Sequence, residues 1–118
     1  MRQIIEKRLI DFALRIIKHT QELKGSFLSD HLSKQIIRSS TSAALNYGEV
    51  QSSESKKDFI HKISIVLKEL RETNINIQLI QGANICQDNN DIECIRRENI
   101  ELISIFYKTW ATAKKKAD

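Results

Sequence analysis

Four hydroxyl side chains stand in a row at Ser39-Ser40-Thr41-Ser42, and they are the most obvious candidate nucleophiles in the chain. A serine or threonine hydroxyl becomes a strong nucleophile only when an adjacent base takes its proton. No histidine neighbours this run in the sequence. Small side chains in the middle of a helix also let another backbone come close. We therefore interpret the run, together with Gly48, as a site of close helix packing.

Carboxylates at helical spacing are the second candidate for chemistry. Asn46 and Glu49, and likewise Glu69 and Glu72, are three residues apart and would share a helix face. Metal sites in helix bundles require a histidine three residues after a glutamate, and no histidine of this chain has that position. The sequence thus predicts no metal, no cofactor and no enzymatic activity. The structural interpretation is a set of hydrogen bonds or ion pairs between packed helices, formed by Asn46, Glu49 and Arg38 or Arg71.

The two cysteines give no further sign of a metal site. Cys86 and Cys94 have no histidine or cysteine neighbours at metal-ligand spacing. We expect two reduced thiols, as in a cytoplasmic protein.

Basic residues form a stripe on one predicted helix. Lys57, His61, Lys68 and Arg71 fall within an arc of roughly 80° when each residue turns the helix by about 100°. This arc is opposite the apolar positions of the same segment, so it must face solvent or a partner. Such stripes bind phosphate backbones by charge neutralisation and counterion release. The alternative is an ordinary solvated face.

A second group of basic residues follows near the end of the chain. Aromatic residues do not interleave with these charges in our interpretation, so base stacking is not expected and any binding would be largely independent of sequence. Lysines at the C-terminal end of a helix also stabilise it by their interaction with the helix dipole, and this is the alternative explanation for the lysines at the end of the chain. The predicted nucleic-acid contacts on this helix are Arg96, Arg97, Lys114, Lys115 and Lys116.

Some apolar residues fall outside the predicted core stripes. Ile75 and Leu79 share the basic side of their helix, and Ile105 points away from the apolar face of the last helix. Several such residues on the long helices of a small domain favour contacts between subunits. We predict that these three residues contribute to a homo-oligomer interface.

Four amphipathic segments separated by short polar stretches provide the framework for these residues. Apolar residues at a spacing of three to four predict helices from about residue 3 to 23, 30 to 50, 55 to 81 and 91 to 114. The predicted N-caps are Asp30 for the second helix, Ser53 or Ser55 for the third, with Asp58 three residues after Ser55 as a weak capping box, and Asp91 for the fourth. Because short connections force neighbouring helices to run antiparallel, the sequence predicts an all-α, up-down-up-down four-helix bundle formed by one domain, residues 1–118.

Composition agrees with this fold. The 118 residues include no proline and only three glycines, so long helices meet few breakers. Apolar residues make up 41% and charged residues 29%, and the formal net charge is +4. No apolar run has the length of a membrane span, and the N-terminal residues are too charged for a signal peptide. We expect a cytoplasmic protein without a membrane partner.

The central part of the chain also carries a family resemblance. Its segments include Ile37-Arg38-Ser39-Ser40-Thr41-Ser42, Asn46-Tyr47-Gly48-Glu49, Ser55-Lys56-Lys57-Asp58-Phe59-Ile60 and Leu67-Lys68-Glu69-Leu70. Together they resemble the four-helix-bundle proteins encoded by intervening sequences in bacterial 23S ribosomal RNA genes. That family in turn resembles the accessory variability protein of diversity-generating retroelements.

This resemblance implies a ring-like homo-oligomer, a pentamer in the favoured case, that binds RNA or DNA and assists a reverse transcriptase. The expected function is therefore that of a non-enzymatic nucleic-acid-binding accessory protein that docks a larger enzyme. A pure protein-interaction scaffold, whose basic faces are only solvated, is the alternative. An enzyme is the third possibility, and the sequence offers no pairing of a histidine with a carboxylate or nucleophile to support it.

Overall fold

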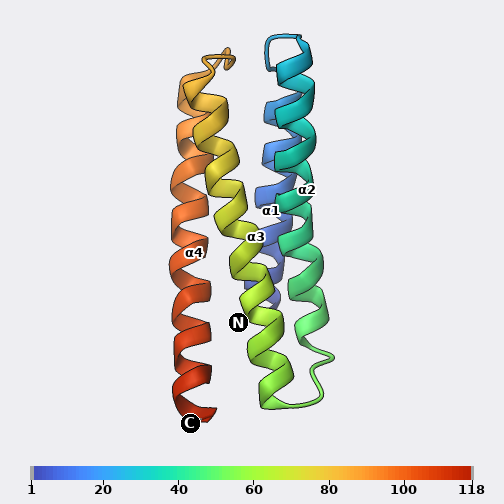
Figure 1. Cartoon of the computed structure of the whole chain (residues 1–118), viewed down its shortest axis with the longest axis vertical. Coiled ribbons are helices and arrows are strands. Elements are labelled where there is room, and N and C mark those ends of the chain that lie inside the picture. Colours follow the sequence, from blue (N-terminus) through green and yellow to red (C-terminus); the bar gives the residue numbers. More distant parts are fainter. Residues whose placement is uncertain (1, 118) are drawn as a thin grey trace.

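The computed structural model describes residues 2–117, and nearly all of them lie in four α-helices (Figure 1). Met1 and Asp118, the ends of the predicted domain, lie outside the described residues. The helices are α1 (Arg2–Thr20), α2 (Phe27–Val50), α3 (Lys56–Gly82) and α4 (Asn89–Ala117). The residues from 2 to 117 contain no strand, which confirms the predicted all-α class.

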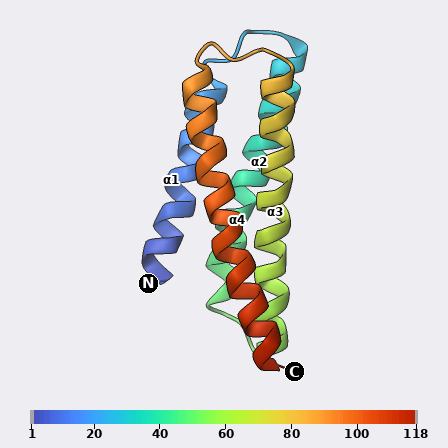
Figure 2. The same cartoon turned by 90° about the vertical axis from the view of Figure 1, so that its left-hand side faces the viewer.

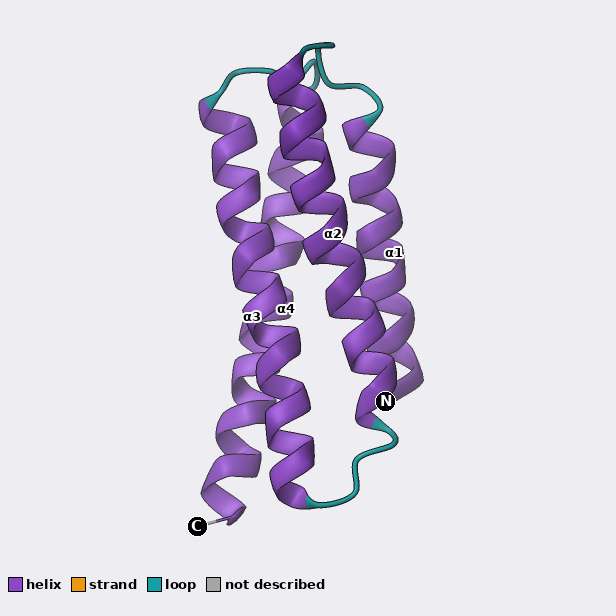
Figure 3. Ribbon diagram, turned by 45° about the vertical axis from the view of Figure 1, so that its right-hand side comes forward, coloured by secondary structure: helices purple, strands orange, loops and turns teal. Residues whose placement is uncertain are grey.

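Successive helices run in opposite directions (Figure 3). The α1–α2 and α3–α4 connections lie at one end of the bundle, and the α2–α3 connection lies at the other. The α1–α2 and α3–α4 connections contact each other: the amide of Lys24 donates a hydrogen bond to the carbonyl of Ile85 over 3.1 Å. The predicted up-down-up-down order is therefore confirmed. We call the end with the α2–α3 connection and the C-terminus of α4 the lysine end, because Lys56 and Lys57 and the run Lys114-Lys115-Lys116 lie there.

The four helices differ in length. At a rise of 1.5 Å per residue, α1 with its 19 residues spans about 28 Å and α4 with 29 residues about 43 Å. Helix α1 therefore stops short of the lysine end, and Figure 2 shows it diverging from α4 towards its N-terminus. The α1–α4 contact is the least extensive between neighbouring helices, and the α2–α3 contact is the most extensive.

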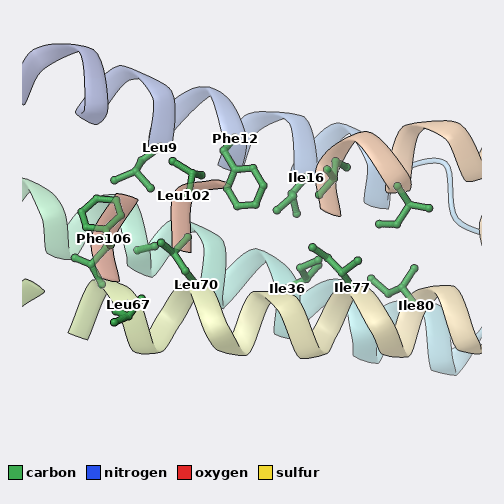
Figure 4. Packing of buried hydrophobic residues seen from close by; sticks show 14 of the residues in the cluster. Leu9, Phe12, Ile16, Ile36, Leu67, Leu70, Ile77, Ile80, Leu102 and Phe106 are labelled. Atoms are coloured by element: carbon green, nitrogen blue, oxygen red, sulfur yellow. The ribbon is translucent and has the colours of Figure 1, made fainter. Parts of the chain in front are cut away.

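Aliphatic side chains from all four helices fill the core (Figure 4). Leu9 and Ile16 of α1 face Leu70 and Ile77 of α3, and each is at most 1% exposed. Leu102 and Phe106 extend the core along α4. The predicted apolar stripes are thus the ones that the fold buries, which explains why hydrophobic periodicity sufficed to predict the helices.

Small side chains lie in the most extensive contact between two helices, that of α2 with α3, in line with the predicted helix packing. Ser39 and Ser40 are fully buried on α2, and the hydroxyls of Ser39 and Thr73 on α3 are 2.8 Å apart. The inclusion of Gly48 in this contact is wrong. Gly48 is exposed, and a Cβ atom added to it would meet nothing within 4 Å.

Two of the three predicted N-caps are wrong. Helix α2 begins at Phe27 because the hydroxyl of Ser26 accepts a hydrogen bond from the amide of Ser29 over 3.0 Å. Helix α4 begins at Asn89, because Asp88 accepts hydrogen bonds from two amides of the first turn. The residues predicted as caps, Asp30 and Asp91, lie instead within the first turns, where a negative charge still stabilises the helix by its interaction with the helix dipole.

The predicted cap of α3 is confirmed. The Ser55 hydroxyl accepts a hydrogen bond from the amide of Asp58 over 3.0 Å. The carboxylate of Asp58 accepts one from the amide of Glu54 over 3.1 Å, one residue earlier than in a standard capping box. This cap fixes the start of α3 at Lys56, and so places Lys56 and Lys57 at the lysine end.

Candidate nucleic-acid interface

The basic stripe of α3 faces outward, as its helical spacing predicted. Lys57, His61, Lys68 and Arg71 are all exposed. Lys68 lies 3.8 Å from a carboxylate oxygen of Glu72, so part of its charge is offset. The stripe thus exists as a surface on which Lys68 alone is paired with a carboxylate of the described residues.

Arg96 and Arg97 do not lie near this charge. They occupy the first half of α4, and both pair with Glu93 on the same helix. Arg96 Nε donates to Glu93 over 2.9 Å, and this hydrogen bond is the main cause that lowers the pKa of Glu93 to about 2. Much of the charge of the two arginines is therefore offset by an intrahelical carboxylate, which makes them poor phosphate contacts.

The lysine end collects positive charge from two helices. Lys56 at the start of α3 and Lys108 and Lys116 on α4 line the same hollow of about 510 Å³, beside Phe59. The segment from 102 to 117 contains four lysines and no acidic residue. Among residues 2–117, no carboxylate lies within ion-pair distance of Lys56, Lys57 or Lys108. Here the cations stay available for an external anion.

Sequence reasoning did not include Lys56 among the candidate contacts. The antiparallel order of α3 and α4 was the signal that could have found it. This order brings the start of one helix beside the end of the next, so Lys56 and Lys57 had to lie near Lys114, Lys115 and Lys116. Lys108 belongs to the same group by its place on α4.

The expectation that no aromatic residue accompanies these charges is wrong. Tyr107 is 49% exposed, and its ring centroid lies 6.0 Å from that of the half-buried Trp110. The ammonium group of Lys114 is 5.5 Å from the centre of the Trp110 ring, a cation–π distance. Spacings of three and four residues place all three side chains on one side of α4.

The predicted polar contacts between helices are confirmed for one residue. Arg38 on α2 pairs with Glu69 over 3.3 Å and also with Glu72, both on α3. Burial alone would raise the pKa of Glu69, but hydrogen bonding from Ser42 and Arg38 outweighs burial, so the pKa lies below its ordinary value.

The other predicted members of this network do not take part. The Asn46 amide donates to the carbonyl of Ser42 on its own helix over 2.8 Å. Glu49 offers only its backbone carbonyl, which accepts from Lys62 over 3.3 Å. Arg71 is exposed on the stripe. Helix spacing alone showed which side chains share a face, and could not show which helix that face meets.

A histidine–carboxylate pair, which sequence analysis did not foresee, joins α1 to α4. His19 Nδ1 lies 2.8 Å from Asp91 Oδ2, and His19 Nε2 lies 3.7 Å from Cys86 Sγ. Burial raises the pKa of the Cys86 thiol, whereas a cysteine nucleophile needs a lowered one. The arrangement is therefore that of a buried structural contact. Within residues 2–117, no group of three histidine, cysteine, aspartate or glutamate side chains is placed to hold a metal ion.

The predicted interface residues differ in exposure. Ile75 and Leu79 are 55% and 48% exposed and line a shallow groove of about 360 Å³ between α2 and α3. Ile105 is half-buried and lines a hollow of about 780 Å³, together with Phe59 and Phe106, beside the first turns of α1. The structure therefore separates the three residues into two surfaces.

None of the described helices is long and apolar enough to cross a membrane.

Comparison with known proteins places the chain in a family. None of the functionally curated proteins matches it. Among solved structures, it is similar to a protein of unknown function from the S23 ribosomal protein family of Bacteroides thetaiotaomicron VPI-5482. The two are 28% identical with a TM-score of 0.79, over 90% of this chain and 97% of the other. The sequence model of the family described as 23S rRNA-intervening sequence protein matches residues 2–108. The chain therefore belongs to the 23S rRNA-intervening sequence protein family.

Proposed function

We propose that this bundle is a non-enzymatic accessory protein that binds RNA or DNA through the lysine end. The observation that supports the proposal best is the group of lysines at the start of α3 and the end of α4, for which residues 2–117 provide no carboxylate partner. Exposed cations that are free of carboxylates gain most from a phosphate backbone, because each contact releases a condensed counterion.

The proposal includes a homo-oligomer, a ring of five subunits in the favoured case. The exposed pair Ile75 and Leu79 supports subunit contacts, since exposed apolar residues in a groove gain free energy when a partner covers them. A ring would repeat the lysine end once for each subunit and so strengthen the summed electrostatic field. By the family resemblance, we further propose that the oligomer docks a reverse transcriptase or another larger enzyme on its nucleic acid.

Removing three lysines of this end should weaken RNA binding and its salt dependence. We expect the variant Lys57→Gln/Lys108→Gln/Lys115→Gln to bind a short structured RNA more weakly at low salt. The slope of log K against log salt should become shallower by about 0.7–0.9 for each phosphate that the variant no longer neutralises. Fluorescence anisotropy of a labelled RNA over a salt series measures both quantities.

The matched control removes three exposed lysines elsewhere, in the variant Lys18→Gln/Lys24→Gln/Lys34→Gln. It changes the net charge by the same amount and should keep most of the slope. Equal losses of affinity in the two variants would show that only net charge matters. Unmeasurable RNA binding by the unaltered protein at low salt would exclude the proposal and favour the protein-interaction scaffold.

A charge in the α2–α3 groove should dissociate the oligomer. We expect Ile75→Glu to reduce the mass in solution to that of one 13.7 kDa chain, because the carboxylate would lose its hydration in the subunit contact. Light scattering after size-exclusion chromatography measures this mass. The control Gln3→Glu adds the same charge at an exposed site of α1 and should leave the mass unchanged. A normal mass for Ile75→Glu would contradict this interface.

A further inference from the structure

The exposed Tyr107 and the half-buried Trp110 of α4 add a feature that charge alone does not explain. Tyr107 leaves about half of its surface in solvent, with Trp110 one helical turn further along. Their planes are inclined by 35° at a centroid distance of 6.0 Å, so they form a small tilted platform. An aromatic ring that remains exposed offers a flat apolar surface to a planar ligand.

One cation lies against this platform, and a second is its neighbour in the sequence. Lys114 lies over the Trp110 ring, and the exposed Lys108 follows Tyr107 directly in the sequence. Glu101 is the last described acidic residue before them, more than one helical turn from Tyr107. Rings flanked by cations and distant from carboxylates are the combination by which proteins bind single strands, with bases stacked on the rings and phosphates held by lysines.

The geometry of a duplex disfavours this mode of binding. Bases inside a helix are stacked on each other and present only their edges, whereas unpaired bases expose their faces to aromatic side chains. We propose that Tyr107 and Trp110 form a stacking platform for unpaired bases, so that the lysine end selects single-stranded nucleic acid. This inference rests on the proposed nucleic-acid binding and names its substrate class.

Trp110 provides the signal for a direct test, because it is the only tryptophan of the chain. Its fluorescence is followed while the full-length protein is titrated with a single-stranded oligothymidylate at low salt. A deoxyribose-phosphate oligomer of the same length that lacks bases is titrated in parallel. We expect quenching by the oligothymidylate, and binding that is stronger than that of the abasic oligomer by on the order of tenfold or more.

Two variants separate stacking from charge. Tyr107→Leu retains an apolar side chain but loses the ring, and it should remove most of the preference for oligothymidylate while leaving abasic binding unchanged. Lys108→Gln should weaken both ligands by a similar factor. Circular dichroism and light scattering check that each variant keeps its helix content and its mass.

The outcomes distinguish the inference from the proposed function. Equal binding of the two oligomers, unaffected by Tyr107→Leu, would overturn the stacking platform and leave electrostatic binding intact. A change of mass in Tyr107→Leu would assign the rings to a subunit contact and would also overturn it. If neither oligomer binds at low salt, nucleic-acid binding itself fails, and the platform fails with it.

Discussion

Replacing Phe106 with alanine should lower the free energy of unfolding by about 3–5 kcal/mol, the usual loss for a buried phenylalanine. Phe106 is 1% exposed, and its ring meets that of Tyr47 edge to face at 5.3 Å and 80°. The substitution removes both the apolar burial and this aromatic pair, and it enlarges the neighbouring hollow that Phe106 already lines. Urea unfolding followed by circular dichroism at one fixed protein concentration measures the change.

The adjacent residue supplies the control. Tyr107→Ala removes an aromatic ring of similar size from the outside of the same helix, where it is 49% exposed. Its effect on the free energy of unfolding should stay near ~0.5 kcal/mol, as for most surface substitutions. Similar losses at the two positions would mean that the face of α4 assigned to the core is wrong.

Replacing Arg38 with methionine should cost about 2–3 kcal/mol at neutral pH, because it leaves the buried Glu69 carboxylate without its cation. The loss falls below that of a fully buried pair because Arg38 itself is 59% exposed, although the Glu69 side chain is only 9% exposed. Thermal or urea unfolding of the single variants and the double variant, compared at one pH, measures the coupling between the two residues.

The loss should also depend on pH, with a definite sign. In the unaltered protein the pKa of Glu69 is lowered, so its contribution to stability is full above its unfolded-state pKa and is lost as pH falls through the folded-state value. Without Arg38, burial dominates and raises that pKa, so Glu69 takes up a proton on acidification. The difference between the two proteins should therefore shrink from neutral pH towards about pH 4.

Removing both partners tests the same idea from the other side. The double variant Arg38→Met/Glu69→Leu should regain most of the lost stability, because no buried charge remains. A double variant as unstable as Arg38→Met would show that the methionine itself disturbs the packing of α2.

The sequence predicted the four helices and their order because each buries a stripe with a regular spacing. Helix starts were less predictable, since Ser26, Asp30 and Asp88 all have cap-forming side chains and the choice depends on which amides they reach. The prediction that Gly48 takes part in close helix packing was wrong for a related reason, because a glycine in a helix permits a close approach of another backbone without requiring one.

Of the candidate site, the exposure of the α3 stripe was predictable from helix geometry alone. The pairing of Arg96 with Glu93 was also predictable in principle, because the two residues are three apart on one helix. The place of Lys56 beside the end of α4 follows from the predicted antiparallel order, whereas the His19–Asp91 contact was not predictable, since it depends on how separate helices meet. A single sequence specifies faces of helices more directly than it specifies their junctions.

The four helices end at different levels, so the two ends of the bundle differ in how firmly their helices are held together. At one end, the two loops are joined by a hydrogen bond, and Asp91 ties α4 to His19 and Arg15 of α1. At the lysine end, α3 and α4 extend beyond α1 and α2 (Figure 1), so fewer apolar contacts oppose local opening there. Local unfolding should thus begin at the lysine end, where the phosphates of RNA or DNA are proposed to bind. A bound nucleic-acid strand would then slow the local unfolding of α4.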